Sequence, residues 1–238
     1  LLVFGNHYLT FIVGCLILFA LLLATFLLPK QKQINDELII LSGKPYRALI
    51  SAIKNSKNSF YYSLVVLLIA ASHSPLYMFF SLHLEKLGWG TSSIAMAWNI
   101  GVVAEISLFF VFHLVEKKIS LIRLLQVSAC FSAVRWFILY SYADVNIIYV
   151  SQILHLFSFG SMQLASMKLI YVLLPKDLKI HSQAVLIILG SGIGAVIGRS
   201  ISSFFVQYIP NDEPLHFMFL IACVLALLAF LASLKIKS

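Results

Sequence analysis

The sequence predicts an all-α membrane protein with seven transmembrane helices. Hydrophobic residues make up 61% of the 238 positions and charged residues only 11%, whereas a soluble domain has about 45–50% and 25%. So few charged side chains cannot cover the surface of a soluble fold of this size, which excludes a soluble enzyme. Seven segments are long and apolar enough to cross a bilayer as helices: residues 8–28, 60–82, 92–112, 121–142, 147–174, 183–209 and 215–234.

The basic residues alternate between the two sides of the predicted spans. The loops at 30–57, 117–123 and 176–179 and the tail at 235–237 hold thirteen of the seventeen Lys and Arg. This distribution satisfies the positive-inside rule and predicts an outside N-terminus and a cytoplasmic C-terminus. The net charge of +8 is then a topology signal in a bilayer-embedded, multi-pass protein, and no nucleic-acid partner is expected.

We expect three parts along the chain, the first of them incomplete. Leu1 lies almost inside an apolar run that exceeds a bilayer-spanning length, so we expect the later part of a longer protein. Residues 1–28 form a helix of a truncated N-terminal bundle, residues 29–59 a cytoplasmic linker, and residues 60–238 a C-terminal six-helix bundle. Within the linker, Tyr46, Leu49, Ile50 and Ile53 share one helical face, which suits either an interfacial helix or a solvated linker.

Four ionisable residues fall inside the predicted spans: Glu105, Arg135, His155 and Arg199. A charge at that depth costs about 2.5–3.5 kcal/mol on insertion scales, which makes each a functional candidate. The first three lie on consecutive helices, which short loops make neighbours, so we expect a Glu105–Arg135 pair with His155 nearby. Such a group can bind and release a proton. The alternative is a static ion pair that fixes helix packing.

Polar and aromatic residues on several helix faces predict a wetted cavity. On the helix of residues 147–174 they fall within an arc of about 100°, and Pro75 lies beside a similar face on residues 60–82. Interhelical hydrogen bonds are the structural alternative. Arg199 either faces the cavity and binds an anion or pairs with outer acidic groups. The predicted cavity residues are His73, Tyr77, Trp98, Gln152, Gln163 and Arg199.

Glycines and the absence of catalytic motifs complete the residue-level analysis. Gly190, Gly194 and Gly198 recur every four residues, which lets helices pack closely. Lys168 lies near a helix end and is expected to extend to the membrane surface. The sequence contains no phosphate-binding loop, HExxH, GxSxG or Cys/His metal spacing. We therefore expect no enzyme activity, no metal and no cofactor, with a proton as the coupling ion.

Four runs resemble the proton-linked permeases of the major facilitator superfamily, in particular the phenylpropionate permease family and more distantly lactose permease. They are SHSPLYMFFSLHLEKLG (72–88), WNIGVVAEI (98–106), AVRW (133–136) and SQILHLFSFGSMQLASMKLI (151–170). The resemblance implies helices six to twelve of twelve, in a protein of the bacterial inner membrane. The last six would form the C-terminal bundle of two inverted three-helix repeats, around a cavity that opens to each side in turn.

The resemblance also implies roles for three residues. Lactose permease has the same acidic–Arg–His order on successive helices, where these groups serve sugar affinity and proton coupling. By similarity, Glu105, Arg135 and His155 are the proton-coupling residues. Lactose permease has an acid one turn after its histidine, where this chain has Ser158, so Glu105 is the best candidate for the proton carrier. Facilitators of this superfamily have the loop pattern Gly-x-x-x-Asp-Arg-x-Gly. The corresponding run HLVEKKIS (113–120) keeps the charge order through Glu116 and Lys117 but lacks both glycines.

The leading functional prediction is the C-terminal half of a secondary active transporter that couples proton entry to uptake of a small organic solute. An uncoupled facilitator or exporter is one alternative, and a seven-helix receptor is another. The polar and aromatic residues suit an aromatic carboxylate, a sugar or a nucleoside. The expected partners are the small-molecule substrate, the lipid bilayer and the missing N-terminal bundle of the same protein, which would be a monomer when full length.

Overall fold

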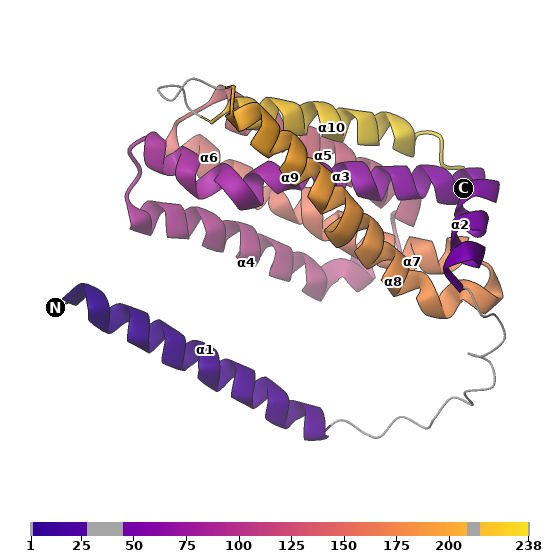
Figure 1. Cartoon of the computed structure of the whole chain (residues 1–238), viewed down its shortest axis with the longest axis horizontal. Helices are drawn as coiled ribbons and strands as arrows, with labels where there is room; N and C mark the ends of the chain where they lie inside the picture. The colour runs from indigo at the N-terminus through magenta and orange to yellow at the C-terminus, as the bar shows by residue number, and fades with distance from the viewer. Residues whose placement is uncertain (1, 28–44, 209–214, 238) are drawn as a thin grey trace. The chain divides into compact units, whose positions relative to one another are not determined.

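The computed structural model describes residues 2–27, 45–208 and 215–237. The chain divides into two compact units, Leu1–Gly43 and Lys44–Ser238. The first unit contains α1 (Leu2–Leu27), drawn in indigo in Figure 1. Its described side chains are mostly apolar and exposed, with Phe26 79% and Leu27 85% accessible.

The second unit is helical throughout its described part, which contains no strand. Most helices begin and end within a few residues of the predicted spans, because the apolar runs are bounded by polar turns. In chain order the elements are α2 (Pro45–Asn55), α3 (Lys57–Lys86), α4 (Thr91–Val115), α5 (Leu121–Ser141), α6 (Val145–Ile153), η2 (Leu156–Gly160), α7 (Ser161–Leu173), η3 (Lys176–His181), α8 (Ser182–Ile187), η4 (Ile188–Gly194), α9 (Ala195–Val206) and α10 (Phe217–Ser233).

Short polar residues start three of these helices. The side chain of Ser56 accepts from Ser59 N at 3.3 Å, and Ser120 caps α5 in the same way. Asp144 accepts from the first backbone amides of α6. These contacts satisfy amide groups that have no partner within the helix. After α3 the chain turns at Gly88, whose φ of 83° is disfavoured for residues with a side chain.

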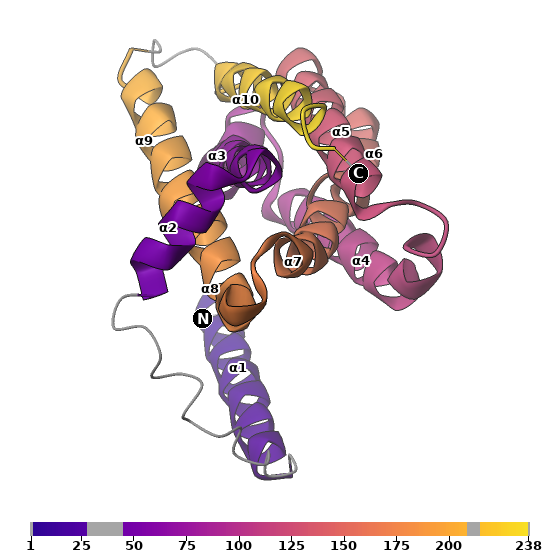
Figure 2. The same ribbon diagram turned by 90° about the vertical axis from the view of Figure 1, so that its right-hand side faces the viewer.

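The core of the second unit is built around α3. This helix packs against α9, α10 and the π turn η4, while α5 packs against α10 and α7. Figure 1 shows α8 and α9 crossing α3 obliquely, and Figure 2 shows α9, α10 and α5 arranged around it. Large apolar and aromatic residues of α3 are fully buried, among them Tyr62, Ile69 and Phe80.

The outer surface suits a lipid environment. Large apolar side chains such as Val103, Phe110 and Val172 are 62%, 77% and 64% exposed, and a soluble protein rarely leaves so many uncovered. Within the described ranges, five helical segments are long and apolar enough to cross a membrane: Lys57–Lys86, Thr91–Val115, Leu121–Ser141, Val145–Leu173 and Lys176–Val206. Cys15–Leu27 and Phe217–Ser233 are shorter apolar helices. This is an integral, multi-pass membrane protein, and the count of seven spans stays a prediction.

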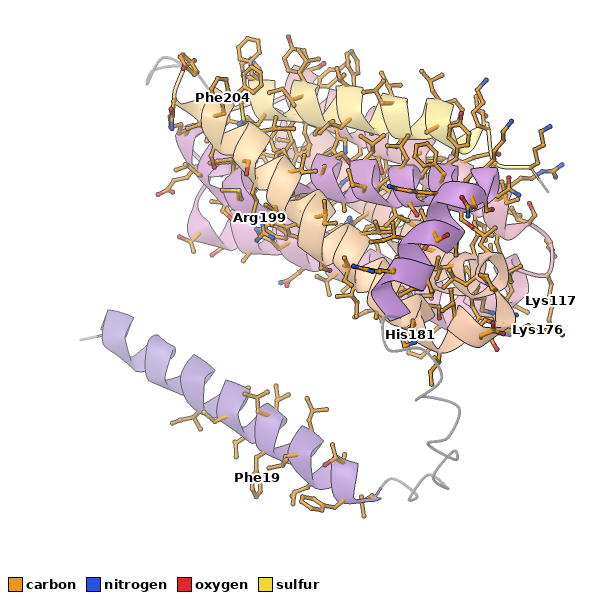
Figure 3. All side chains as sticks on the ribbon, turned by 45° about the vertical axis from the view of Figure 1, so that its right-hand side comes forward. Phe19, Lys117, Lys176, His181, Arg199 and Phe204 are labelled. Atoms are coloured by element: carbon orange, nitrogen blue, oxygen red, sulfur yellow. The ribbon has the colours of Figure 1, made fainter. Side chains whose placement is uncertain are left out.

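Helix α2 forms, and part of its predicted apolar face packs against the bundle. Leu49 and Ile53 pack against the hydrophobic core, whereas Ile50 is 51% exposed beside the exposed Arg47. The side chain of Tyr46 and residues 28–44 of the predicted linker lie outside the described residues. Lys117 and Lys176, from two different loops, lie at the same end of the bundle (Figure 3).

Two predicted spans are interrupted by π turns, which is a departure from the expectation of continuous helices. Residues 145–173 form α6, η2 and α7, and residues 182–206 form α8, η4 and α9. The η4 turn contains Gly190, Gly192 and Gly194. A π turn adds a residue to the helical turn and re-aims the side chains beside it, and such turns are frequent at functional sites.

Candidate functional site

A buried arginine organises a polar network in the middle of the bundle. Arg135 on α5 is 1% exposed. Its Nη1 donates to His155 Nδ1 at 2.9 Å, and its Nη2 donates to Gln152 Oε1 at 2.6 Å. The short connection capped by Asp144 brings α6 back beside α5, which places both acceptors opposite Arg135. A buried cation with two hydrogen bonds avoids most of the cost of burying a charge.

The contact with Arg135 fixes the proton on His155. A guanidinium only donates, so His155 Nδ1 must accept, and in the neutral ring the hydrogen is then on Nε2. His155 Nε2 lies 3.6 Å from Glu105 Oε2 on α4. This distance is too long for a hydrogen bond but short enough for electrostatic attraction. The three groups therefore form a chain from Arg135 through His155 to Glu105.

Glycine lets α4 approach this chain closely. A Cβ atom on Gly101 would lie 3.7 Å from Gln152 Oε1 and from His155 Cδ2, so a larger side chain there would meet the network. A Cβ on Gly160 of η2 would lie 3.0 Å from Leu108 and 3.5 Å from Glu105 Cγ. The side chain of Glu105 keeps 20% of its surface accessible. It is the only one of the three network members to be more than slightly exposed.

Aromatic rings frame the network. Phe159 stacks on His155, with the ring centroids 5.3 Å apart and the planes at 10°. The guanidinium of Arg135 lies over Trp136, 4.8 Å from its ring centroid. His73 packs edge-on against the same indole, also with a centroid distance of 4.8 Å. These contacts shield the cation from lipid and add cation–π attraction.

A cavity of about 450 Å³ lies beside the network, within the size range of small-molecule sites. It is formed by α3, η2, α7, α8, η4 and α9. His73 and Phe159 belong both to this cavity and to the aromatic frame of the network. The lining residues are Val66, Ala70, His73, Ser74, Tyr77, Met78, Phe159, Met162, Gln163, Leu186, Ile187, Gly190, Ser191, Ala195 and Arg199.

The predicted proton-coupling residues lie together, but in a different order from the expected one. The sequence suggested that Glu105 pairs with Arg135 directly, whereas His155 lies between them and contacts both. The π turn that begins just after His155 lets its ring enter the space between α4 and α5. No ion pair joins Arg135 to Glu105 in the described part of the chain.

Four of the six predicted cavity residues line the cavity: His73, Tyr77, Gln163 and Arg199. The other two do not. Gln152 is 1% exposed and is committed to Arg135, because it faces α5 and not the void. Trp98 donates its Nε1 hydrogen to Ser81 Oγ at 2.9 Å and stacks on Tyr77, so it supports the wall from behind.

Arg199 faces the cavity, as one of the two alternatives for this residue expects, while the outer acidic residues Asp212 and Glu213 lie outside the described residues. This residue lies on α9 (Figure 3), lines the cavity, and is exposed. Its Nε donates to Ala195 O at 3.1 Å, one turn earlier on the same helix. That bond holds the guanidinium beside the cavity. No ion pair joins Arg199 to an acidic group among the described residues.

The three predicted packing glycines are unequal. A Cβ on Gly194 would lie 2.7 Å from Leu67 O and 2.9 Å from Ala70 Cβ on α3, and one on Gly198 would overlap Ala71 and Ser74. Only a residue without a side chain allows these two contacts between α3 and the η4–α9 segment. Gly190 is looser, since its Cβ would meet only Val66 Cγ1 at 3.8 Å.

Sequence reasoning missed two features. Trp136, which supports both Arg135 and His73, is one of the largest fully buried residues, and its position next to Arg135 in the AVRW run was the available signal. Lys168 does not simply extend to the surface, because its Nζ forms an ion pair with Glu116 Oε2 and lies 5.5 Å from the Phe112 ring centroid. This pair joins α7 to the end of α4.

Comparison with known proteins identifies the family. The chain matches the family described as "MFS_1 like family" over residues 3–232. It belongs to this family. The sequence is 28% identical over 144 residues to the "Probable 3-phenylpropionic acid transporter" of Escherichia coli (strain K12), an alignment that covers 60% of this chain and 38% of that protein. It is 24% identical over 220 residues to the "Uncharacterized transporter YwbF" of Bacillus subtilis (strain 168), covering 92% of this chain and 52% of that one.

A solved structure shares the fold. A mutant of the nucleoside transporter NupG superposes with a TM-score of 0.72 at 14% sequence identity, covering 88% of this chain and 55% of that protein. The chain thus spans about half the length of the relatives that it matches, or less. The predicted resemblance to the major facilitator superfamily is confirmed. The homologues are membrane transporters and not enzymes, which supports a role in transport.

Proposed function

We propose that this MFS_1-like chain is the C-terminal half of a proton-coupled uptake transporter for a small organic solute. Residues 57–141 and 145–233 would be its two inverted three-helix repeats, and the partner bundle of the same protein would close the cavity from the other side. Alternating access would expose the cavity to each face of the inner membrane in turn, with the N-terminus of the chain outside and the C-terminus in the cytoplasm.

The observation that carries the proposal is the Arg135–His155–Glu105 chain beside the cavity. Glu105 retains accessible surface, so a proton can reach it. When its carboxylate is ionised, it attracts the Nε2 hydrogen of His155. When Glu105 binds a proton, that attraction is lost and His155 is held by Arg135 alone.

His155 links the proton to the conformation. A histidine that is protonated on both nitrogens has no lone pair on Nδ1, so it cannot accept from Arg135. Protonation of His155 would therefore break the 2.9 Å contact and leave Gln152 as the remaining hydrogen-bond acceptor of the guanidinium. Phe159, stacked on the His155 ring, also lines the cavity. Movement of His155 would be transmitted to the solute through this ring.

The lining of the cavity favours an organic anion with an apolar, aromatic body. Arg199 is a cation at its wall, and none of the described residues that line it has a carboxylate side chain. Tyr77 and Phe159 offer aromatic surface. The relative from Escherichia coli is named as a probable transporter of 3-phenylpropionic acid, which has this combination of ring and carboxylate. We therefore propose a small aromatic monocarboxylate as the solute class.

Transport by the full-length protein with Glu105→Gln tests the coupling. The variant should lose proton-driven accumulation of a labelled aromatic carboxylate but retain exchange across the membrane, because the cavity is unchanged. Glu116→Gln at the end of α4 is the matched control and should accumulate solute normally. If Glu105→Gln accumulates solute as the parent does, Glu105 is not the proton carrier. If the parent's accumulation survives collapse of the proton gradient, the protein is an uncoupled facilitator.

A further inference from the structure

His73 presents one ring nitrogen that the protein does not use. The residue lies on α3, is 1% exposed and lines the cavity. Its Nδ1 lies 2.8 Å from Ile69 O, one turn earlier on α3. A carbonyl oxygen only accepts hydrogen bonds, so the hydrogen of His73 is on Nδ1. Its Nε2 then carries a lone pair and acts as an acceptor.

Within the described ranges, His73 Nε2 is buried and has no hydrogen-bond partner. Its neighbours cannot supply one. The indole Nε1 of Trp136 points to Ser72 Oγ at 3.3 Å, the Nε2 hydrogen of His155 faces Glu105, and the ring of Phe159 has no polar atom. A buried acceptor without a donor is unfavourable, so a solute group that donates a hydrogen bond to it would gain binding free energy.

A second buried atom nearby has the complementary need. Arg135 Nε is a donor and also lacks a partner among the described residues. Arg135 and His73 pack against the same indole, each 4.8 Å from the ring centroid of Trp136. Of these two residues only His73 lines the cavity, and a hydroxyl group of a solute has the hydrogen that His73 Nε2 can accept. A carboxylate only accepts and would repel the lone pair on His73 Nε2.

We propose that His73 selects a hydroxyl group on the solute, so that the transported molecule is a hydroxylated aromatic carboxylate. The hydroxyl donates to His73 Nε2, and the carboxylate lies toward Arg199 on the opposite element, α9. This assignment rests on the proposed function, because it presumes that the cavity binds an aromatic carboxylate. Beyond that function, it assigns to His73 the discrimination between hydroxylated and unsubstituted aromatic carboxylates.

The assignment is tested in cells that contain the full-length protein, by measuring how well unlabelled compounds compete with the uptake of a labelled aromatic carboxylate. The probes are 3-phenylpropionate and its 2-, 3- and 4-hydroxyphenyl analogues, which differ from it by one oxygen atom. A hydrogen bond to a buried acceptor is worth about tenfold in affinity. At least one hydroxylated isomer should therefore compete about tenfold better than the parent compound. His73→Leu should reduce that preference to less than about twofold, since the acceptor is lost.

Two further variants keep the result interpretable. His73→Gln retains an acceptor oxygen and should preserve part of the preference even if His73→Leu folds poorly. His83→Leu is the matched control, because His83 is also a buried histidine of α3 but lies outside the cavity lining. It should leave the preference unchanged.

The outcomes separate the two proposals. If no hydroxylated isomer is preferred, or if the preference survives in His73→Leu, the role of His73 is overturned while carboxylate transport stands. If none of the four carboxylates competes for uptake or is taken up, the proposed solute class itself fails, and this inference fails with it. A preference that disappears in His73→Leu and persists in His83→Leu supports it.

Discussion

The hydrogen bond between Arg135 and Gln152 offers the most direct test of the polar network. Both residues are 1% exposed, and Arg135 Nη2 donates to Gln152 Oε1 at 2.6 Å. Gln152→Leu keeps the volume similar but removes the acceptor. A hydrogen bond to a charged group contributes about 1.5–3 kcal/mol, and its loss leaves a buried donor unpaired. We expect the free energy of unfolding to fall by about 2 kcal/mol.

Thermal unfolding of the purified protein in detergent measures this change. For a chain of 150–250 residues, 1 kcal/mol corresponds to about 2–4 °C in Tm, so Gln152→Leu should lower Tm by about 4–8 °C. Gln207→Leu, the same substitution at the exposed end of α9, should change Tm by less than about 2 °C.

A double-mutant cycle assigns the loss to the contact with Arg135. In an Arg135→Leu background the donor is already gone, so Gln152→Leu should cost much less than it does alone. The coupling energy should be about 1.5–3 kcal/mol, as for a charge-assisted hydrogen bond. Additive effects, or a Gln152→Leu shift no larger than that of Gln207→Leu, would refute the view that this bond holds the network.

Two further predictions concern helix packing and the end of the bundle. Gly198→Ala should lower Tm by several degrees, because its Cβ would overlap Ala71 and Ser74 of α3, whereas Gly90→Ala, which meets nothing within 4 Å, should be nearly neutral. Equal effects of these two substitutions on Tm would contradict close packing at Gly198. Glu116→Gln should cost less than about 1 kcal/mol, because the side chain of its partner Lys168 is 50% exposed. The exchange Glu116→Lys with Lys168→Glu should restore the parent Tm in low salt, and a Glu116→Gln loss well above 1 kcal/mol would show that the pair is a major stabilising contact.

Several aspects of the site were predictable because membrane burial restricts where charges can lie. An ionisable residue within an apolar run must find a partner inside the protein, so Glu105, Arg135 and His155 on successive helices were expected to meet. Periodicity likewise placed His73 and Tyr77 on one face of α3, and both line the cavity. These inferences needed only the spacing of polar residues and the shortness of the loops.

Other aspects depended on angles that sequence spacing does not contain. The π turn η2 rotates the residues around it relative to a regular helix, and this put His155 between Arg135 and Glu105. Gln152, three residues before His155 on the neighbouring α6, faces α5 and not the cavity. A helical wheel assumes 100° per residue throughout, so it could not separate Gln152 from Gln163, which does line the cavity.

The sequence by itself determined that this is a helical membrane protein and which polar residues must be buried together, because composition and hydropathy decide what lipid can solvate. Only the tertiary structure decided which atoms of those residues contact one another. Hydrogen-bond partners depend on differences of an ångström or two and on the direction of each side chain. Those follow from the close contacts of Gly194 and Gly198 with α3, from Gly101 beside His155, and from the π turns, all of which are set by packing among several helices.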